Sequence, residues 1–418
     1  MAILNIGYIK KYSKAVLFLT MAFSITCCIS KRKDNIRRPD NNENLFVIDI
    51  DSAKSIDKIL CSSILEPPQT IILESNSNCV VKDIHSIDIY EEKIYILDSS
   101  SNHLFVFNID GAFLYTIGHQ GKGRGEYTEL SDFCIDRKAG VIFLWDPVMK
   151  MALKYDIHDR KYISSIKIDI GGYDCYSLMC YNKKLYLNRT SMELDKENYL
   201  ISEIDESSGQ ETAKYLRAND YNHGWNLPLR LQYGSFINKN STSPKFVELF
   251  SDTIVSFTDK GITPMIAIKS KNMARNEDVE KFAKKCIEHK DYNIFNLDPN
   301  LIFMPRCIWD MGNYISFEMM SGGDIVYILY NKITKEALKS NRFTNDYVSS
   351  KYYVAANLLF SNDIGMISVL RSDFIPYFKE EIVANGGLNN NIDNYKGLNQ
   401  LEETSNPVLF FHKYKQSE

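Results

Sequence analysis

Tryptophan, glycine and proline are scarce in this sequence, and neither sign of charge is in large excess. The 418 residues include 3 Trp, 20 Gly and 11 Pro, and 49 Lys and Arg face 53 Asp and Glu. The formal net charge of −4 predicts no strong attraction to nucleic acid or to an anionic membrane surface. Tyr and Phe are abundant instead, at 26 and 22 residues, and they favour a sheet-rich fold.

Motifs typical of metal-binding or catalytic chains are missing as well. There is no C-x-x-C pair, and the seven His and the Cys residues show no spacing of zinc-site type. No serine stands in a G-x-S-x-G elbow, so the usual α/β-hydrolase signature is absent. We therefore expect neither a metal nor a cofactor, and the sequence indicates architecture and cellular address more clearly than a molecular activity.

The N-terminus carries the pattern of an export signal. Lys10, Lys11 and Lys14 precede an uncharged, mostly apolar run over 15–25, and a basic cluster follows at 31–33. A membrane span needs about 20 apolar residues. The shorter run with its basic start therefore predicts a secretory signal.

The run ends in I-T-C-C, which resembles the bacterial lipobox. Ile25 stands three residues before Cys28, so Cys28 is the predicted lipid acceptor, and 1–27 are the predicted signal peptide. The alternative is an ordinary cleaved signal with two incidental cysteines. Two acyl chains hold a protein stably on a membrane, so a lipidated Cys28 predicts a body anchored to the outer membrane. The polar segment 28–43 would be a flexible tether, and its basic residues leave both the periplasmic and the surface side open.

The remaining cysteines do not form a dense disulfide framework. Seven are scattered along the chain, at positions 61, 79, 134, 175, 180, 286 and 307. Export permits disulfides. Cys175 and Cys180 flank the apolar stretch Y-S-L-M and could pair with each other or could equally be buried thiols.

Internal repeats predict the fold. The clearest unit, 84–118, contains alternating strands separated by turn signals, and 130–168 repeats its pieces in the same order. Equivalent strands begin at Leu104 and Ala152, 48 residues apart. Weaker units cover about 176–216, 230–270 and 305–343, and the last is split between 355–372 and 406–415.

Six units of three or four antiparallel strands predict a six-bladed β-propeller over 44–418. Closing the sheets into a ring removes exposed edges, and the ring needs a clasp. Two N-terminal strand segments, 45–50 and 69–75, have no repeat of their own, so we expect one of them to complete the last blade beside 406–415. A long open β-solenoid is the alternative, although it needs shorter and more even periods.

Two helices are expected as insertions among the strands. Apolar residues at helical spacing in 272–289 predict a helix that widens the interval before the fifth unit. A second helix is expected at about 373–384. The first insertion is expected to decorate one rim of the ring and could contact a protein.

Four features carry a family resemblance: the lipobox, the unit K-I-Y-I-L-D-S-S-S-N-H-L-F-V-F-N-I-D-G at 93–111, the glycine-rich loop, and the closing N-P-V-L-F-F-H-K-Y-K. In these features the chain resembles the six-bladed β-propeller lipoproteins of bacteria, a group related in fold to NHL-repeat and TolB-like propellers. The resemblance extends over about 45–414 and is strongest in 84–168. It implies the fold and a location in the cell envelope. It implies no particular activity, because a propeller hosts many functions.

The glycine-rich run G-H-Q-G-K-G-R-G-E-Y at 118–127 is the most conspicuous local feature. A phosphate-binding loop would open a helix, whereas this run leads into another strand. The structural interpretation is a connection between blades whose glycines adopt positive φ. The functional interpretation is that Lys122, Arg124 and Glu126 face a ligand at one mouth of the channel.

A second candidate segment is Y-N-H-G-W-N-L at 221–227, with His223 and Trp225. Trp stacks on sugar rings in many sites, and the alternative is a plug that packs between blades. Carboxylate pairs such as Asp88/Glu91 and Asp252/Asp259 could serve glycoside hydrolysis only at the short separations that this chemistry requires.

The sequence thus favours a lipid-anchored propeller that binds a ligand or scaffolds other proteins. The expected partners are the membrane, through the lipid, and a glycan, a peptide or another envelope protein, with no nucleic acid. The alternative is a propeller enzyme, a hydrolase or lyase acting on glycans or peptides. A third interpretation is a sensor subunit that partners membrane signalling proteins.

Overall fold

The computed structural model describes residues 45–191, 198–227, 236–239, 241–290, 297–321, 323–347, 358–384, 395–398 and 400–415. These residues belong to one compact unit, Asp34–Glu418. The predicted signal peptide and the whole of the predicted tether, Cys28 included, lie outside the described residues. None of the helices in the described part of the chain is long and apolar enough to span a membrane.

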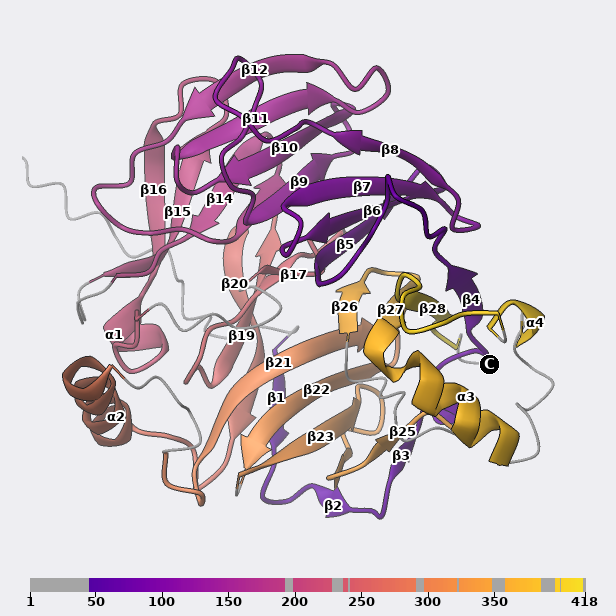
Figure 1. Cartoon of the computed structure of the whole chain (residues 1–418). Coiled ribbons are helices and arrows are strands. Elements are labelled where there is room, and N and C mark those ends of the chain that lie inside the picture. Colours follow the sequence, from indigo (N-terminus) through magenta and orange to yellow (C-terminus); the bar gives the residue numbers. More distant parts are fainter. Residues whose placement is uncertain are drawn as a thin grey trace, which may run out of the picture. The chain divides into compact units, whose positions relative to one another are not determined.

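The described residues form six mainly antiparallel sheets, the blades, that follow one another along the chain (Figure 1), and one further two-stranded parallel sheet. Blade one consists of β5 (Ile84–Tyr90), β6 (Lys93–Asp98), β7 (His103–Asn108) and β8 (Phe113–Ile117). Blade two consists of β9 (Asp132–Asp136), β10 (Val141–Asp146), β11 (Met151–Asp156) and β12 (Tyr162–Lys167). Blade three consists of β13 (Leu178–Tyr181), β14 (Lys184–Asn188), β15 (Tyr199–Asp205) and β16 (Glu211–Arg217).

The later blades recruit strands from the N-terminal segment. Blade four has β17 (Phe236–Ile237), β18 (Lys245–Phe246), β19 (Thr253–Thr258), β20 (Gly261–Lys269) and the added β1 (Phe46–Asp49). Blade five has β21 (Ile302–Met311), β22 (Tyr314–Ser321), β23 (Asp324–Asn331), β24 (Ala337–Ser340) and the added β2 (Lys54–Ser55). Blade six has β26 (Leu358–Ser361), β27 (Gly365–Leu370), β28 (Val408–Lys413) and β4 (Gln69–Ile72).

The pairing of β4 with β28 closes the ring. One N-terminal segment therefore completes the last blade, as the sequence predicts, and it is the second of the two candidates. The first segment contributes β1, which pairs in parallel with β20 of blade four. Then β2 pairs in parallel with β24, and β3 (Ile59–Leu60) pairs in parallel with β25 (Phe343–Thr344). We call residues 45–60 the belt, and its pairing covers sheet edges that would otherwise be open.

The cores lie between neighbouring blades. Blades one and two share Tyr95, Leu104, Phe133 and Leu153 among other buried residues, and similar clusters lie between each later pair of blades. The second strands β6 and β10 are almost wholly buried because a blade neighbours them on both faces. Their continuous apolar runs are the consequence.

Helices interrupt the strand pattern where the sequence predicts them. The inserted helix is α2 (Asn276–His289), and α3 (Ile375–Ala384) occupies the second expected position. Val279, Phe282 and Cys286 of α2 are buried, whereas Ile287 is 43% exposed. Short helical turns complete the secondary structure: η1 (Cys61–Ser63), α1 (Ala218–Tyr221), η3 (Ser372–Phe374) and α4 (Tyr395–Leu398).

Candidate functional site

The two ends of the blades carry very different connections. Consecutive strands of a blade run in opposite directions, so its first and third turns lie at one end, while its second turn and the link to the next blade lie at the other. The first and third turns are short, as at 91–92, 182–183 and 259–260. The other end holds the long connections, including 118–131, 168–177 and the insertion with α2. We call these ends the short-turn face and the long-connection face.

A repeated hydrogen-bond device fixes the long connections to the blades. At the end of the second strand of blade two, Asp146 accepts hydrogen bonds from the backbone N–H groups of Thr128 and Glu129, just before the first strand of that blade. Asp98 does the same for residues 82 and 83, and Asn188 for residues 176 and 177. The carboxylate or amide at this position thus holds the entry to each of the first three blades.

All five candidate ligand-binding residues lie in long connections, three in the link from β8 to β9 and two in the link that follows β16. The structure therefore brings them to the same face, on different blades. The contacts that each one makes show which side chains are available on this face.

The glycine-rich loop is folded around the side chain of Glu126. Its Oε1 atom lies 2.9 Å from Nε2 of His119, and its Oε2 atom accepts a 2.7 Å hydrogen bond from the N–H of Gly123. These contacts, the Gly123 N–H first, hold the pKa of Glu126 below its usual range. A β-carbon on Gly121 would lie 1.9 Å from Oε2, so any larger residue there would displace the Glu126 carboxylate.

The last glycine of the loop packs against blade two. Gly125 has φ of +78°, and a β-carbon there would lie 2.7 Å from the ring of Tyr162. The Tyr155 hydroxyl donates to the Gly125 carbonyl, and the guanidinium of Arg124 lies 5.7 Å from the centre of the Tyr162 ring. Lys122 and Arg124 are exposed. Glu126 thus orders the loop, and its neighbours Lys122 and Arg124 present positive charge to solvent.

Trp225 packs inside the molecule, as the plug interpretation expects. Its side chain is only 2% exposed, its ring stacks on Phe282 of α2 at 5.5 Å, and it meets Phe250 edge-on at 5.2 Å. His223 is partly exposed, with Nδ1 2.5 Å from Oδ1 of Asn276 at the start of α2. Both residues connect the link after blade three to α2, and the Trp225 ring has no free face for a sugar.

A cavity of about 250 Å³ opens on the long-connection face between blades two and three. Trp145, Tyr173 and Tyr176 provide aromatic lining, and Glu129 and Lys150 provide charge. Trp145 is held in place by its indole N–H, which donates a 2.9 Å hydrogen bond to the Cys175 carbonyl. The remaining lining residues are Pro147, Val148, Ile168, Ile170, Asp174 and Cys175.

Sequence reasoning did not single out this cavity. Its walls come from three separate connections, and the glycine-rich connection 118–131 supplies Glu129. The one local signal is the W-D-P-V-M-K segment at 145–150, where an aromatic residue ends a buried strand.

The carboxylate pairs named from the sequence do not form a catalytic pair. Asp88 is 3% exposed and bound to Arg137 at 2.8 Å, and Glu91 lies 3.4 Å from His158. Asp252 and Asp259 flank the two ends of β19 (Thr253–Thr258), so they are about 20 Å apart. Glycoside hydrolysis requires at most about 9.5 Å.

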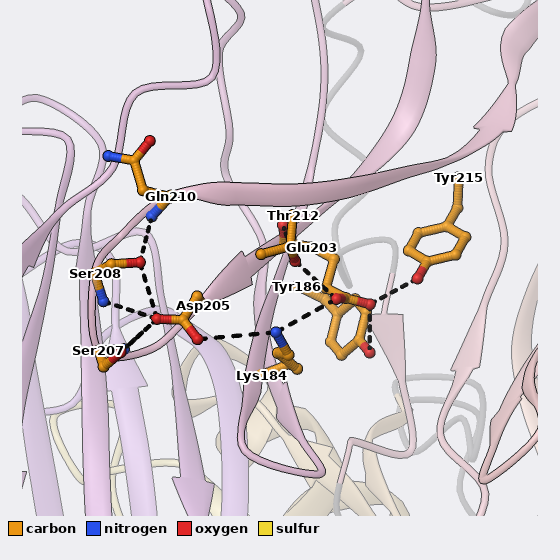
Figure 2. Close-up of polar contacts among 9 residues, drawn as sticks. All are labelled: Lys184, Tyr186, Glu203, Asp205, Ser207, Ser208, Gln210, Thr212 and Tyr215. Carbon is orange, nitrogen blue, oxygen red and sulfur yellow. Dashed lines mark hydrogen bonds and ion pairs between the residues drawn. The ribbon is translucent and has the colours of Figure 1, made fainter. Parts of the chain in front are cut away.

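A different carboxylate pair lies on β15 of blade three (Figure 2). Glu203 and Asp205 are two residues apart and lie on the same side of the strand. Nζ of Lys184 lies between them, 3.7 Å from Oε1 of Glu203 and 3.9 Å from Oδ2 of Asp205. Glu203 accepts hydrogen bonds from the hydroxyls of Tyr215 at 2.6 Å, Thr212 at 2.8 Å and Tyr186 at 3.3 Å. Their E-x-D spacing on a strand is the sequence signal that could have revealed them.

Asp205 of this pair is held in its charged form. Hydrogen bonds from the hydroxyls and backbone N–H groups of Ser207 and Ser208 hold the pKa of Asp205 far below its usual range. A general acid at neutral pH needs a raised pKa. Figure 2 shows the seryl donors on one side of Asp205 and Lys184 on the other. The pair therefore fits a structural role near the third turn of blade three, on the short-turn face.

The described residues contain neither a cluster of metal ligands nor a disulfide bond. No group of three or more His, Cys, Asp or Glu side chains in the described ranges could hold a metal ion. The seven cysteines of the described chain are free thiols, Cys175 and Cys180 included. Burial raises the pKa of Cys61, Cys134 and Cys175.

The fold defines the class of protein, a six-bladed β-propeller. Comparison with known families identifies the family within this class. Residues 45–413 match the family described as "Domain of unknown function (DUF4934)", and the chain belongs to this family. No curated protein matches the chain.

Among the solved structures that resemble the chain are two from Bacteroides species. A protein of Bacteroides fragilis, described as a "Putative exported protein", is 19% identical, with a TM-score of 0.66 over 89% of this chain and 100% of that chain. A member of the DUF4221 family from Bacteroides vulgatus is 12% identical, with a TM-score of 0.49 over 84% of this chain and 98% of that chain. The first likeness shows the propeller fold.

Proposed function

We propose that this chain is a lipid-anchored propeller of the bacterial cell envelope that binds a glycan, a peptide or another envelope protein through its long-connection face. The address is supported by the lipobox-like end of the export signal at Cys28 and by the description of the Bacteroides fragilis structure as exported. The same proposal includes a relationship to NHL-repeat and TolB-like propellers, which the four-stranded blades and the circular closure support.

One observation carries the binding function. Exposed Lys122 and Arg124 are held on an ordered loop whose connection continues into a cavity where Tyr173 and Tyr176 are partly exposed above the buried Trp145. Rigid aromatic walls beside a few charged groups are typical of sites for small polar ligands. Tyr and Trp present an apolar face and a polar edge, as sugars and peptides require.

An enzymatic function has less support. Of the two carboxylate pairs named from the sequence, one has its Asp88 in an ion pair with Arg137, and the two carboxylates of the other are too far apart for hydrolysis. The lowered pKa of Asp205 keeps that carboxylate charged. We therefore place binding ahead of catalysis.

A glycan and peptide array probed with residues 44–418 tests the binding function. We expect a defined set of ligands whose signal falls in the Lys122→Ala/Arg124→Ala variant. The matched control is Lys138→Ala/Lys183→Ala, which removes two exposed lysines from short turns and should leave the signal unchanged. Equal loss in both variants, or no ligand at all, would count against a site on this face.

Membrane fractionation of the full chain tests the anchor separately. Cys28→Ala should release the protein from the membrane fraction and abolish labelling by a fatty-acid analogue. Cys27→Ala should leave both unchanged, because Ile25 lies three residues before Cys28. Retention of Cys28→Ala on the membrane would overturn the lipid anchor without affecting the binding function.

A further inference from the structure

A larger cavity, of about 510 Å³, lies where the belt passes from blade four to blade five. Here β1 pairs with β20 of blade four, and β2 pairs with β24 of blade five (Figure 1). The belt supplies residues 50, 51 and 55–57, and the remaining lining comes from Asn272, Ile302, Met319, Ser321, Val326, Ile328 and residues 339–342. Its size falls within the range of about 300–1,000 Å³ typical of small-molecule sites.

The floor of this cavity is aliphatic. Ile50, Ile302, Met319 and Ile328 form its base, each at most 5% exposed, and the partly exposed Ile56 and Val326 provide its accessible apolar surface. Strand packing on both sides fixes these side chains, so the floor is preformed. It suits an unbranched or branched aliphatic group of a ligand.

Two of the charged lining residues are already committed to the belt. Asp51 accepts hydrogen bonds from the Lys271 N–H at 2.8 Å and from the Ser270 hydroxyl at 2.7 Å, and these lower its pKa, the Lys271 N–H most. Lys339 donates a 2.9 Å hydrogen bond from Nζ to the Ile50 carbonyl. These contacts hold the belt against blades four and five.

The other two charged residues stand at the open rim. Arg342 Nη1 lies 3.3 Å from Asp57 Oδ1, and their side chains are 60% and 75% exposed. An exposed pair of this kind contributes little to stability, so each partner can exchange the other for a ligand. The guanidinium offers five N–H donors to a carboxylate, and the Asp57 carboxylate accepts from an ammonium.

We propose that this cavity binds an α-amino acid with an aliphatic side chain. In such a zwitterion the ammonium and the carboxylate are attached to one carbon, which matches the adjacent Asp57 and Arg342 at the rim. The side chain then enters the aliphatic floor. The site lies apart from the glycine-rich loop, so it goes beyond the binding function proposed above.

Calorimetry on residues 44–418 tests the ligand class with leucine and two blocked derivatives. Leucine should bind, and glycine should bind about tenfold or more weakly because it lacks the side chain. Arg342→Gln should weaken the binding of leucine by about tenfold. It should hardly change the binding of leucinamide, because leucinamide has no carboxylate. Asp57→Asn should weaken leucine in the same way but should not affect N-acetylleucine, which has no ammonium.

A second exposed ion pair provides the control. Arg371 and Asp373 lie 3.0 Å apart with side chains 62% and 49% exposed, in blade six and outside the lining of this cavity. Arg371→Gln and Asp373→Asn should leave leucine binding unchanged. All four substitutions are at exposed positions, so thermal unfolding should confirm an intact fold. Absence of leucine binding, or equal loss in the control variants, would overturn the proposal, whereas loss of array binding in Lys122→Ala/Arg124→Ala would not affect it.

Discussion

Ile71 and Leu409 come from opposite ends of the chain and face each other in the register of β4 and β28. Both side chains are at most 1% exposed, and both belong to the cluster between blade six and blade one. The clasp of the ring is therefore an apolar contact as well as a hydrogen-bonded strand pair. Loss of this contact should loosen two blades at once.

Leu409→Ala should lower the free energy of unfolding by about 2–5 kcal/mol, because it leaves a cavity in a fully buried site. Denaturant unfolding followed by circular dichroism measures this loss. The control is Ile364→Ala in the β26–β27 turn of the same blade, where the side chain is 62% exposed and the expected change is within about 0.5 kcal/mol. A loss no larger than that of the control would mean that the clasp is not a site of tight packing.

The sequence predicts this architecture well where the signals are local. Alternating strands and turn residues indicate the six units and the strand at 69–75, and helical spacing indicates α2. The partner of the first N-terminal segment was not predictable in this way. Alternation in 45–50 shows that it is a strand, but its parallel pairing with residues 266–269 depends on an edge that exists only in the folded ring.

The candidate site shows the same limit. The glycine-rich run correctly marks an irregular connection, and its lysine and arginine are exposed. The burial of Trp225 depends on Phe282, which belongs to a helix 57 residues later in the chain. The cavity beside Trp145 is likewise assembled from three connections, so no contiguous motif encodes it.

His412 should make the protein less stable in mild acid. The ring lies in β28 with 0% exposure, and its burial lowers the pKa from the ordinary 6.5 to about 4. Between these values the unfolded chain binds the proton and the folded chain does not, so stability falls as pH falls below about 6.5. At pH 5 the loss should be about 2 kcal/mol relative to pH 7.5.

Denaturant unfolding at pH 7.5 and pH 5 tests this in the wild-type chain and in His412→Gln. The variant removes the titrating ring, so its difference between the two pH values should be smaller by about the same 2 kcal/mol. Ile364→Ala, the exposed substitution used above, is the control, because it removes no titratable group and should leave the pH dependence unchanged. An identical pH dependence in all three proteins would contradict the role of His412.

Trp225→Ala should destabilise the protein by about 3–5 kcal/mol and release α2. The ring fills the space between Phe250 and Phe282, so its removal leaves α2 without its main aromatic contact. Hydrogen exchange along 276–289 measures the local effect, and denaturant unfolding measures the global one. Trp225→Phe should recover most of both. If Trp225→Ala kept wild-type exchange in α2, the packing role would be wrong, and the ring would regain its place as a ligand candidate.

Glu126→Gln should loosen the glycine-rich loop and leave global unfolding unchanged. The carboxylate binds both His119 and the Gly123 N–H, and its lowered pKa means that the charged form is present throughout neutral and mildly acidic pH. Trypsin cleaves after Lys122 and Arg124, so the rate of limited cleavage at these two bonds reports the order of the loop.

We expect faster cleavage in Glu126→Gln, and also in Gly121→Ala, where the added β-carbon would displace the same carboxylate. Cleavage after Lys138 in a short turn of blade two should be equal in all three proteins, which controls for a change in the fold as a whole. Equal cleavage of the loop in wild type and Glu126→Gln would show that the carboxylate does not order it. Glu126 would then be free to contact a ligand directly, and its substitution should weaken array binding as strongly as that of Lys122 and Arg124.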